Sequence, residues 1–296
     1  MTQEALQPSN ATQSIVGDKA REAVSALRGY AYQVYAAALA WLDVADDEEL
    51  HLEVAEDFAS VAREALRATQ VKDTPGTVSL ASEAVRNAIG AYVGLVEANP
   101  GRTVRFVFLT TAMITQERKR EHRTGDVPGM EFWQRVADGT DMAPLRKVLE
   151  ALDLDAKAHA FIKARNDVRL RDELVRRIEW RCGASDITDL AKRLRERVAS
   201  YAFQHLKVPT AEGERLADTV FITVLETSVI PDRERRVLRS GRLKEVLDAA
   251  SRVAAPGSAG PRAPPATRRA GSTSTACRRW PCGRWSRAAS ASSASS

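Results

Sequence analysis

The sequence predicts an α/β fold, with a mixed sheet flanked by helices and followed by an all-helical region. From residue 21 to 44, apolar residues recur at spacings of three and four, which is typical of one buried helix face. Residues 50–54 alternate between apolar and polar side chains, and residues 65–72 also have a strand pattern. Residues 103–111, TVRFVFLTT, form a near-continuous apolar run that indicates a strand buried on both faces. This order of helix, strand, strand, helix and strand indicates a compact unit around a mixed sheet.

The boundaries of these elements follow from local signals. The first helix is expected to bury one stripe of residues, made up of Val24, Leu27, Tyr30, Val34, Ala38 and Trp41. Acidic residues 46–49 end it in a solvated turn. Pro75-Gly76 breaks the chain after the second strand, and Thr77 or Ser79 is expected to cap a helix that runs to about Ala98.

Only helical patterns follow from Glu131 onward, and they cover residues 131–138, 143–153, 171–181, 186–206, 211–228 and 233–249. After Val253 the chain contains no Leu, Ile, Val, Met, Phe or Tyr, so that segment cannot bury enough apolar surface to fold. A natural disordered basic tail is one interpretation. We prefer another, in which a GC-rich gene is read out of frame and the true protein continues differently.

We therefore divide the chain into a flexible arm at 1–20, an α/β core at 21–125, a helical region at 126–250 and a disordered Arg/Ser/Ala/Pro tail at 251–296. No run of apolar residues is long enough for a membrane span, and the N-terminus lacks the pattern of a secretory signal, so cytoplasmic residence is expected. The three cysteines are too few and scattered for a disulfide framework or a zinc cage.

The formal net charge of +5 does not indicate nucleic-acid binding. Eight arginines and no Asp, Glu or Lys lie in residues 250–296: Arg252, Arg262, Arg268, Arg269, Arg278, Arg279, Arg284 and Arg287. Without them the rest of the chain is slightly acidic. Any nucleic-acid function must therefore be argued from a site.

Polar residues at the ends of the first two strands could form such a site. Gln70 and Lys72 are two residues apart, so their side chains leave the same face of a strand. If Asp57 pairs opposite Gln70, all three groups converge. That register places Arg63-Glu64 at a two-residue turn, where Gly or Asn is favoured, so a longer loop or a shifted pairing stays open. Phosphodiester hydrolysis needs a divalent cation and positive charge near the phosphate, which this set could supply.

These residues resemble a known family. The Asp57…Gln70-Val71-Lys72 pattern resembles the Mrr-like form of the PD-(D/E)XK nuclease motif. With Arg28-Gly29-Tyr30-Ala31-Tyr32-Gln33, Glu53 and Glu56, it looks like the N-terminal double-stranded-DNA endonuclease domain of CD-NTase-associated antiphage effectors. Similar domains are also fused to signalling ATPases in related defence proteins. The resemblance covers residues 20–115 well and continues loosely to about 200, and it implies a restriction-endonuclease-like core.

The resemblance also implies a role for each matched residue. Asp57 would be the principal ligand of Mg²⁺ or Mn²⁺, and Gln70 would stand in for the usual second acid. Lys72 would position the attacking water and stabilise charge on the phosphate, and Gln33 would reach the site from the helix. Glu53 and Glu56 would be auxiliary ligands, with Glu56 less suited because its neighbour Asp57 should point the opposite way.

Other interpretations stay open at this point. Asp57 with Lys72 could be an ordinary surface ion pair, and Gln33 an interior amide. A basic cluster that follows the last strand could grip a DNA backbone or be a solvated connector; it comprises Arg118, Lys119, Arg120 and Arg123.

The expected function is metal-dependent cleavage of double-stranded DNA in antiphage defence, with no membrane partner. We expect it to be gated by homo-oligomerisation through a sensor module missing from this chain. A catalytically silent adaptor whose helices bind a partner, and an RNA nuclease, are the alternatives.

Overall fold

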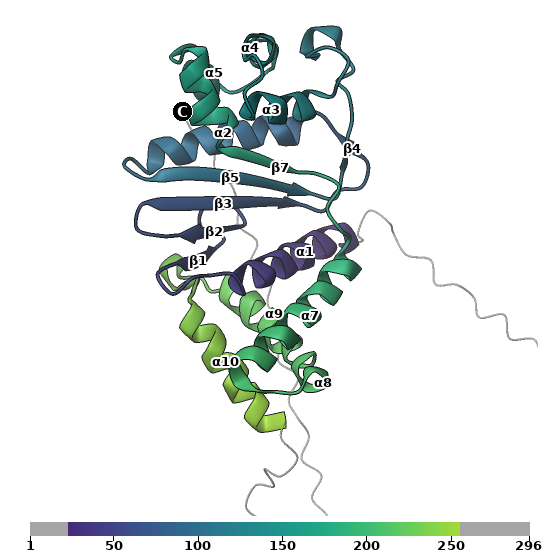
Figure 1. Ribbon diagram of the computed structural model, residues 1–296, viewed down its shortest axis with the longest axis vertical. Coiled ribbons are helices and arrows are strands. Elements are labelled where there is room, and N and C mark those ends of the chain that lie inside the picture. The colour runs from purple at the N-terminus through teal and green to yellow at the C-terminus, as the bar shows by residue number, and fades with distance from the viewer. Residues whose placement is uncertain (1–22, 255–296) are drawn as a thin grey trace, which may run out of the picture. The chain divides into compact units, whose positions relative to one another are not determined.

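A six-stranded mixed sheet divides the protein into two helical layers, as Figure 1 shows. The computed structural model describes residues 23–254. The helices are α1 (Val24–Trp41), α2 (Glu83–Ala98), α3 (Gly129–Ala137), α4 (Ala143–Ala151), α5 (Ala156–Lys163), α6 (Asp167–Leu170), α7 (Ile187–Leu206), α8 (Thr210–Gly213), α9 (Leu216–Ser228) and α10 (Ser240–Ala254), with short helical turns η2 (Arg120–His122), η3 (Arg171–Val175) and η4 (Arg233–Arg235). The strands are β1 (Glu49–Leu52), β2 (Phe58–Val61), β3 (Ala65–Lys72), β4 (Thr77–Val78), β5 (Thr103–Thr110), β6 (Met113–Ile114), β7 (Ile178–Arg181) and β8 (Val237–Leu238).

The sheet has the strand order β7-β5-β3-β2-β1-β8, and two hairpins in it carry the predicted site. β1 with β2 and β2 with β3 are antiparallel, whereas β3, β5 and β7 run parallel. Phe58 pairs with Thr69, and the bond from Ala62 N to Ala65 O closes a two-residue turn over Arg63-Glu64. The predicted register is therefore confirmed. The turn accepts Arg and Glu because neither has a positive φ.

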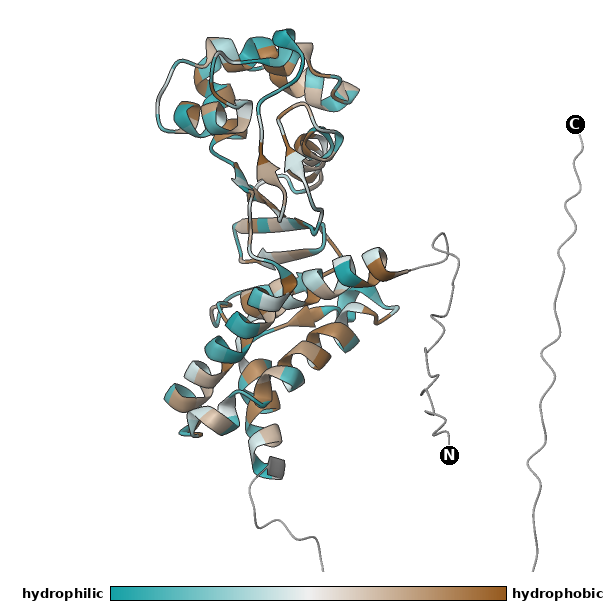
Figure 2. Cartoon of the chain, turned by 90° about the vertical axis from the view of Figure 1, so that its right-hand side faces the viewer, coloured by the Kyte–Doolittle hydropathy of each residue, from teal (hydrophilic) through white to brown (hydrophobic). Residues whose placement is uncertain are grey.

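Each face of the sheet has its own hydrophobic core. On one face α2, α3, α4 and α5 pack over side chains such as Leu66 and Phe106. On the other face α1, α7, α9 and α10 enclose Trp41, Leu50 and Val71. The strand alternation separates the two sets. Figure 2 shows the hydrophobic residues concentrated on the strands and on the helix faces that pack against the sheet and against one another.

The α/β class, the mixed sheet and the mainly helical second half are thus as predicted. β3 has the predicted bounds, and α2 and β5 end within a residue of theirs. Among the described residues, no helix is long and apolar enough to cross a membrane.

Several local predictions were wrong. Val24 and Leu27 are 65% and 67% exposed, because burial of α1 begins only near Tyr32, where the helix meets the sheet and α7. β2 was not predicted, because four residues are too short to show a period. Thr77 lies in β4, which pairs with β6, so Ser82 and neither Thr77 nor Ser79 is the N-cap of α2.

The second half is not entirely helical. The predicted helix 171–181 is a short π-helical turn followed by β7, because parallel pairing with β5 outweighs the local helical pattern. The predicted helix 233–249 begins with η4 and β8, and α5 was not predicted. α10 continues to Ala254, so residues 251–254 of the predicted tail are helical. The rest of that tail, and the predicted arm at 1–20, lie outside the described residues.

Candidate active site

The turn between β1 and β2, residues 53–57, carries the predicted acidic residues. It is closed by the bond from Glu53 N to Asp57 O at 2.9 Å. Glu53 has φ +53° and Glu56 has φ +65°, a left-handed conformation that is unfavourable for residues with a Cβ. The expectation that Glu56 points away from the site assumed extended backbone. Its left-handed backbone instead allows Glu56 to contact Gln70.

Asp57 is held from two directions. Gln33 Nε2, from α1, donates to Asp57 Oδ1 at 2.9 Å, and the backbone N–H of Val71 donates to Oδ2 at 2.5 Å. Continuing the β2–β3 register by one residue places Asp57 opposite Gln70. Asp57 makes no direct ion pair with Lys72 in the described part of the chain, so the interpretation as a simple surface ion pair does not apply.

Gln70 has one satisfied and one unsatisfied end. Its Nε2 donates to Glu56 Oε2 at 2.9 Å. Its Oε1 is buried and has no hydrogen-bond partner among the described residues. With the amide nitrogen facing Glu56, which accepts its hydrogen bond, the atom left without a partner is the carbonyl oxygen.

Burial raises the pKa of all three carboxyl groups of the turn. The pKa of Asp57 is raised mainly by burial, against the opposing effects of the Val71 N–H, Lys72 and Gln33. Burial and then repulsion from Asp57 raise the pKa of Glu56, and the same two causes raise that of Glu53. The turn therefore concentrates negative charge that is poorly solvated, which a cation would relieve.

The side-chain oxygen atoms gathered here suit a hard cation that retains some water molecules as ligands. Across residues 23–254, no three His, Cys, Asp or Glu side chains gather closely enough to hold a metal by themselves. Asp57, Glu56 and the Gln70 carbonyl oxygen offer two carboxylates and one neutral oxygen. Mg²⁺ is commonly bound through one or two carboxylates with waters in the remaining positions, so these residues fit it.

The Arg28–Gln33 stretch ties α1 to its surroundings, which sequence reasoning did not foresee. Arg28 Nε donates to Asp73 Oδ2 at 2.7 Å, and the Asp73 side chain is 2% exposed. Tyr30 OH bonds Ser228 Oγ at 2.7 Å, and Tyr32 OH donates to the carbonyl of Ser185 at 2.8 Å. These contacts fix the helix that presents Gln33. The signal for Asp73 was its position one residue beyond Lys72, where the strand ends.

The basic cluster lies on the connector after β6. Arg123 Nε donates to the carbonyl of Glu117 at 2.8 Å, and Lys119 Nζ lies 3.6 Å from Glu121 Oε1. Arg118 and Arg120 are exposed. β5, which leads to this connector, ends at Thr110 opposite Lys72, so the connector leaves the same end of the sheet as the candidate site. A role in gripping DNA stays a prediction.

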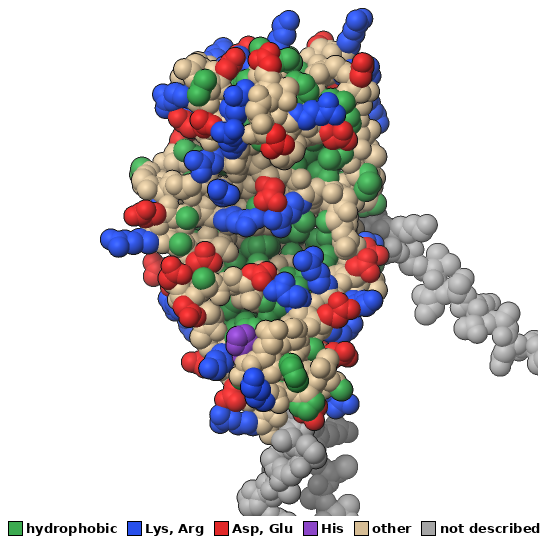
Figure 3. All heavy atoms as spheres, viewed as in Figure 1, with side chains coloured by type: hydrophobic (Ala, Val, Ile, Leu, Met, Phe, Trp, Pro, Cys, Tyr) green, Lys and Arg blue, Asp and Glu red, His purple; other side chains and the backbone are tan. Residues whose placement is uncertain are grey.

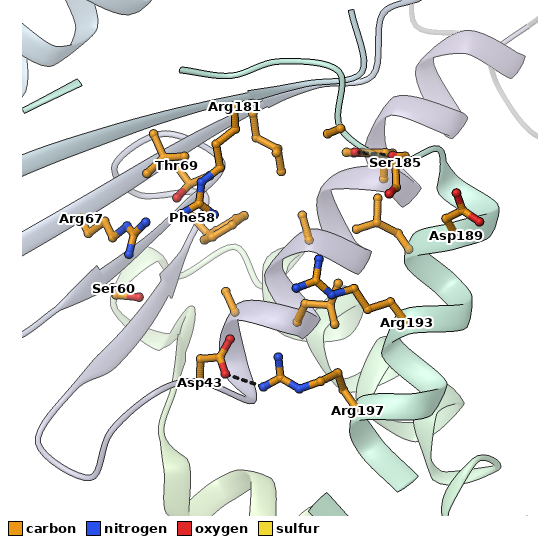
Figure 4. A pocket seen from close by; sticks show the side chains of 18 of the residues that line it. Asp43, Phe58, Ser60, Arg67, Thr69, Arg181, Ser185, Asp189, Arg193 and Arg197 are labelled. Atoms are coloured by element: carbon orange, nitrogen blue, oxygen red, sulfur yellow. Dashed lines mark hydrogen bonds and ion pairs between the residues drawn. The ribbon is translucent and has the colours of Figure 1, made fainter. Parts of the chain in front are cut away.

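A cavity of about 620 Å³ lies on the face of the sheet that α1 and α7 cover, between these helices and the strands. Figure 3 shows it as a hollow with hydrophobic side chains inside and Lys and Arg side chains near its mouth. In the close-up of Figure 4, Arg67, Arg181 and Arg193 point into it, and Arg197 pairs with Asp43 at 2.5 Å. None of the predicted site residues lines this cavity, and Gln70 and Lys72 point to the opposite face of the sheet, so the cavity is separate from the candidate site.

No protein-family model matches the sequence, and no curated protein matches it. Among solved structures, the chain is similar to Cap4 SAVED/CARF-domain containing receptors. One is from Acinetobacter baumannii, in complex with the cyclic trinucleotide 2'3'3'-cAAA, with 10% identity and a TM-score of 0.44 over 76% of this chain and 44% of that one. Another is from Moraxella osloensis, with 10% identity and a TM-score of 0.44 over 77% and 47%. The chain thus spans less than half the length of these receptors, and similarity this weak supports no functional argument.

Proposed function

We propose that this chain is a Mg²⁺-dependent endonuclease that hydrolyses DNA phosphodiester bonds, as an effector of bacterial antiphage defence. The observation that carries the proposal is the unpaired carbonyl oxygen of Gln70, buried beside Glu56 and on the same strand face as Lys72. An unsatisfied buried acceptor costs about 1–3 kcal/mol, and a bound cation would give it a partner. The defence role rests on the sequence resemblance described above.

Each side chain has a defined task in this reaction. Asp57 and Gln70 would hold the ion, with Glu56 beside them. When bound, Mg²⁺ supplies Lewis acidity toward the phosphate and the attacking water. Gln33 and the Val71 N–H orient the Asp57 carboxylate, leaving its other lone pairs for the ion. The Lys72 ammonium, on the same strand face as Gln70, stabilises negative charge that develops on the phosphate.

The test is cleavage of supercoiled plasmid by the full chain with Mg²⁺ and with EDTA. Asp57→Ala and Lys72→Ala should each reduce the rate by about 100-fold or more. Glu64→Ala, in the exposed turn of the neighbouring hairpin, and Lys192→Ala, exposed on α7, are matched charge controls and should cut like the wild type. Cleavage that survives EDTA and both site substitutions would contradict the assignment.

Two further measurements separate the alternatives. Calorimetric titration with Mn²⁺ should show binding that Asp57→Ala abolishes, and a chain that neither binds Mn²⁺ nor cuts would favour the adaptor. A parallel assay on single-stranded and double-stranded RNA tests the RNA alternative, since the same residues could hydrolyse either backbone. Faster cleavage of RNA than of DNA would overturn the proposed substrate.

A further inference from the structure

The segment that joins α9 to α10 lies across the turn of the candidate site. We call this segment, residues 230–239, the strap; it contains η4 and β8. β8 pairs with β1 as the outermost strand, with Leu238 opposite Leu50. The carbonyl of Arg236 accepts a hydrogen bond from Leu52 N at 2.9 Å, one residue before the turn begins. The strap therefore continues the sheet up to the first residue of the turn.

The side chain of Arg236 links the strap to the turn itself. Its guanidinium donates to three backbone carbonyls, those of Ile230 at 2.6 Å, Glu53 at 3.1 Å and Pro231 at 3.3 Å. Arg233 donates to the carbonyl of Val54. Two arginines of the helical half thus hold the first two carbonyls of the turn. An arginine can do this because its planar fork presents several donors at fixed angles.

The turn needs such support. Two of its five residues have a left-handed backbone, which persists only where the surroundings impose it. Glu53 and Val54 form the first half of the turn, and Glu56 and Asp57 form the second. The bond from Glu53 N to Asp57 O joins the two halves, so the position of Glu53 determines that of Asp57.

We propose that Arg236 is a positioning residue, which fixes the turn so that Glu56 and Asp57 lie beside Gln70. Because Arg236 lies between α9 and α10, the ion-binding site depends on the placement of these two helices. Arg236 itself follows Glu53 by 183 residues in the sequence. A partner that shifts either helix would change the affinity of the site for its cation. This inference rests on the proposed function for the role of the ion, whereas the effect on the turn can be measured without it.

The experiment compares Arg236→Ala, Arg236→Lys and Arg235→Ala in the full chain. Arg235 is the matched control, because it is exposed in the same segment and its side chain makes no hydrogen bond or ion pair within residues 23–254. Mn²⁺ affinity is measured by calorimetry, amide exchange by mass spectrometry of peptides covering the turn at 50–58 and, as the reference, β5 at 103–110, and global stability by urea unfolding.

Arg236→Ala should weaken Mn²⁺ binding about ten-fold, as loss of an outer-shell partner typically does. It should also speed exchange over 50–58, and that of the Val71 N–H bonded to Asp57, while exchange over 103–110 in β5 stays unchanged. Arg236→Lys should fall between it and the wild type, and covers the case in which the alanine variant fails to fold. Exchange over 50–58 like that of Arg235→Ala, or faster exchange across both peptides, would overturn the proposal. If the wild type binds no Mn²⁺, the proposed function fails, and the exchange result still decides the role of Arg236.

Discussion

Gln70 brings an oxygen but no negative charge to the candidate site, which limits how tightly it can hold a cation. Replacing it by Glu would add a third carboxylate beside Glu56 and Asp57 and would remove the hydrogen bond that Gln70 donates to Glu56. We expect Gln70→Glu to lower the stability of the metal-free chain and to raise Mn²⁺ affinity on the order of ten-fold, because ligand charge sets affinity for hard cations. Titration calorimetry measures the Mn²⁺ affinity, and scanning calorimetry measures the thermal unfolding of the metal-free chain. Gln204→Glu, on the exposed side of α7, is the control, and equal effects of both substitutions would contradict the ligand role of Gln70.

The charge of Asp57 makes a pH-dependent contribution to stability. Because burial raises its pKa above the ordinary 3.8, the folded metal-free chain binds more protons than the unfolded chain just above that pH. The free energy of unfolding contributed by this group therefore falls as pH rises through that window. We expect Asp57→Asn to gain stability relative to the wild type between about pH 4 and 7 in EDTA, measured by urea unfolding at each pH. A constant difference between the two proteins across this range would show that the carboxyl is not perturbed.

At the scale of elements, a buried carboxylate anchors the connector that carries the basic cluster. Glu117 is 1% exposed and accepts bonds from Leu80 N at 3.0 Å and from Gly129 N at 3.1 Å. Glu117→Ala would leave both N–H groups unpaired, that of Leu80 shortly before α2 and that of Gly129 at the start of α3. We expect it to lower the free energy of unfolding by about 3 kcal/mol, measured by urea titration. Glu121→Ala, on the exposed part of the same connector, should change it by less than about 0.5 kcal/mol, and similar losses for both would refute the anchor.

How far an element could be predicted depended on whether its pattern is local. β3 and β5 were predicted because their alternating or continuous apolar residues are long enough to show a period. β7 was missed because it follows a run of charged residues in which Arg176 pairs with Asp172 at helical spacing. Its strand conformation comes from pairing with β5, about 70 residues earlier in the sequence. Local residues do not encode that partner.

At the scale of the whole molecule, the candidate site also combines features that local sequence encodes with features that depend on distant residues. Asp57, Gln70 and Lys72 could be brought together from sequence because one hairpin register relates them. The contact of Gln70 with Glu56 depends on a positive φ that no glycine signalled. The contacts of Arg233 and Arg236 with the turn cross nearly the whole described chain, and only the folded structure reveals them. The candidate residues could therefore be named from sequence, whereas the groups that hold them in place are visible only in the structure.

The shared sheet should make the two cores unfold together. Leu149 on α4 and Leu247 on α10 are both fully buried, but they belong to the cores on opposite faces of the sheet. Leu149→Ala and Leu247→Ala should each lower the free energy of unfolding by about 2–5 kcal/mol. Because β3 and β5 contribute side chains to both cores, each substitution should shift one common transition, followed by circular dichroism and by amide exchange in α2 and α9. Two separate transitions, each shifted by only one substitution, would show instead that the two cores on opposite faces of the sheet unfold independently.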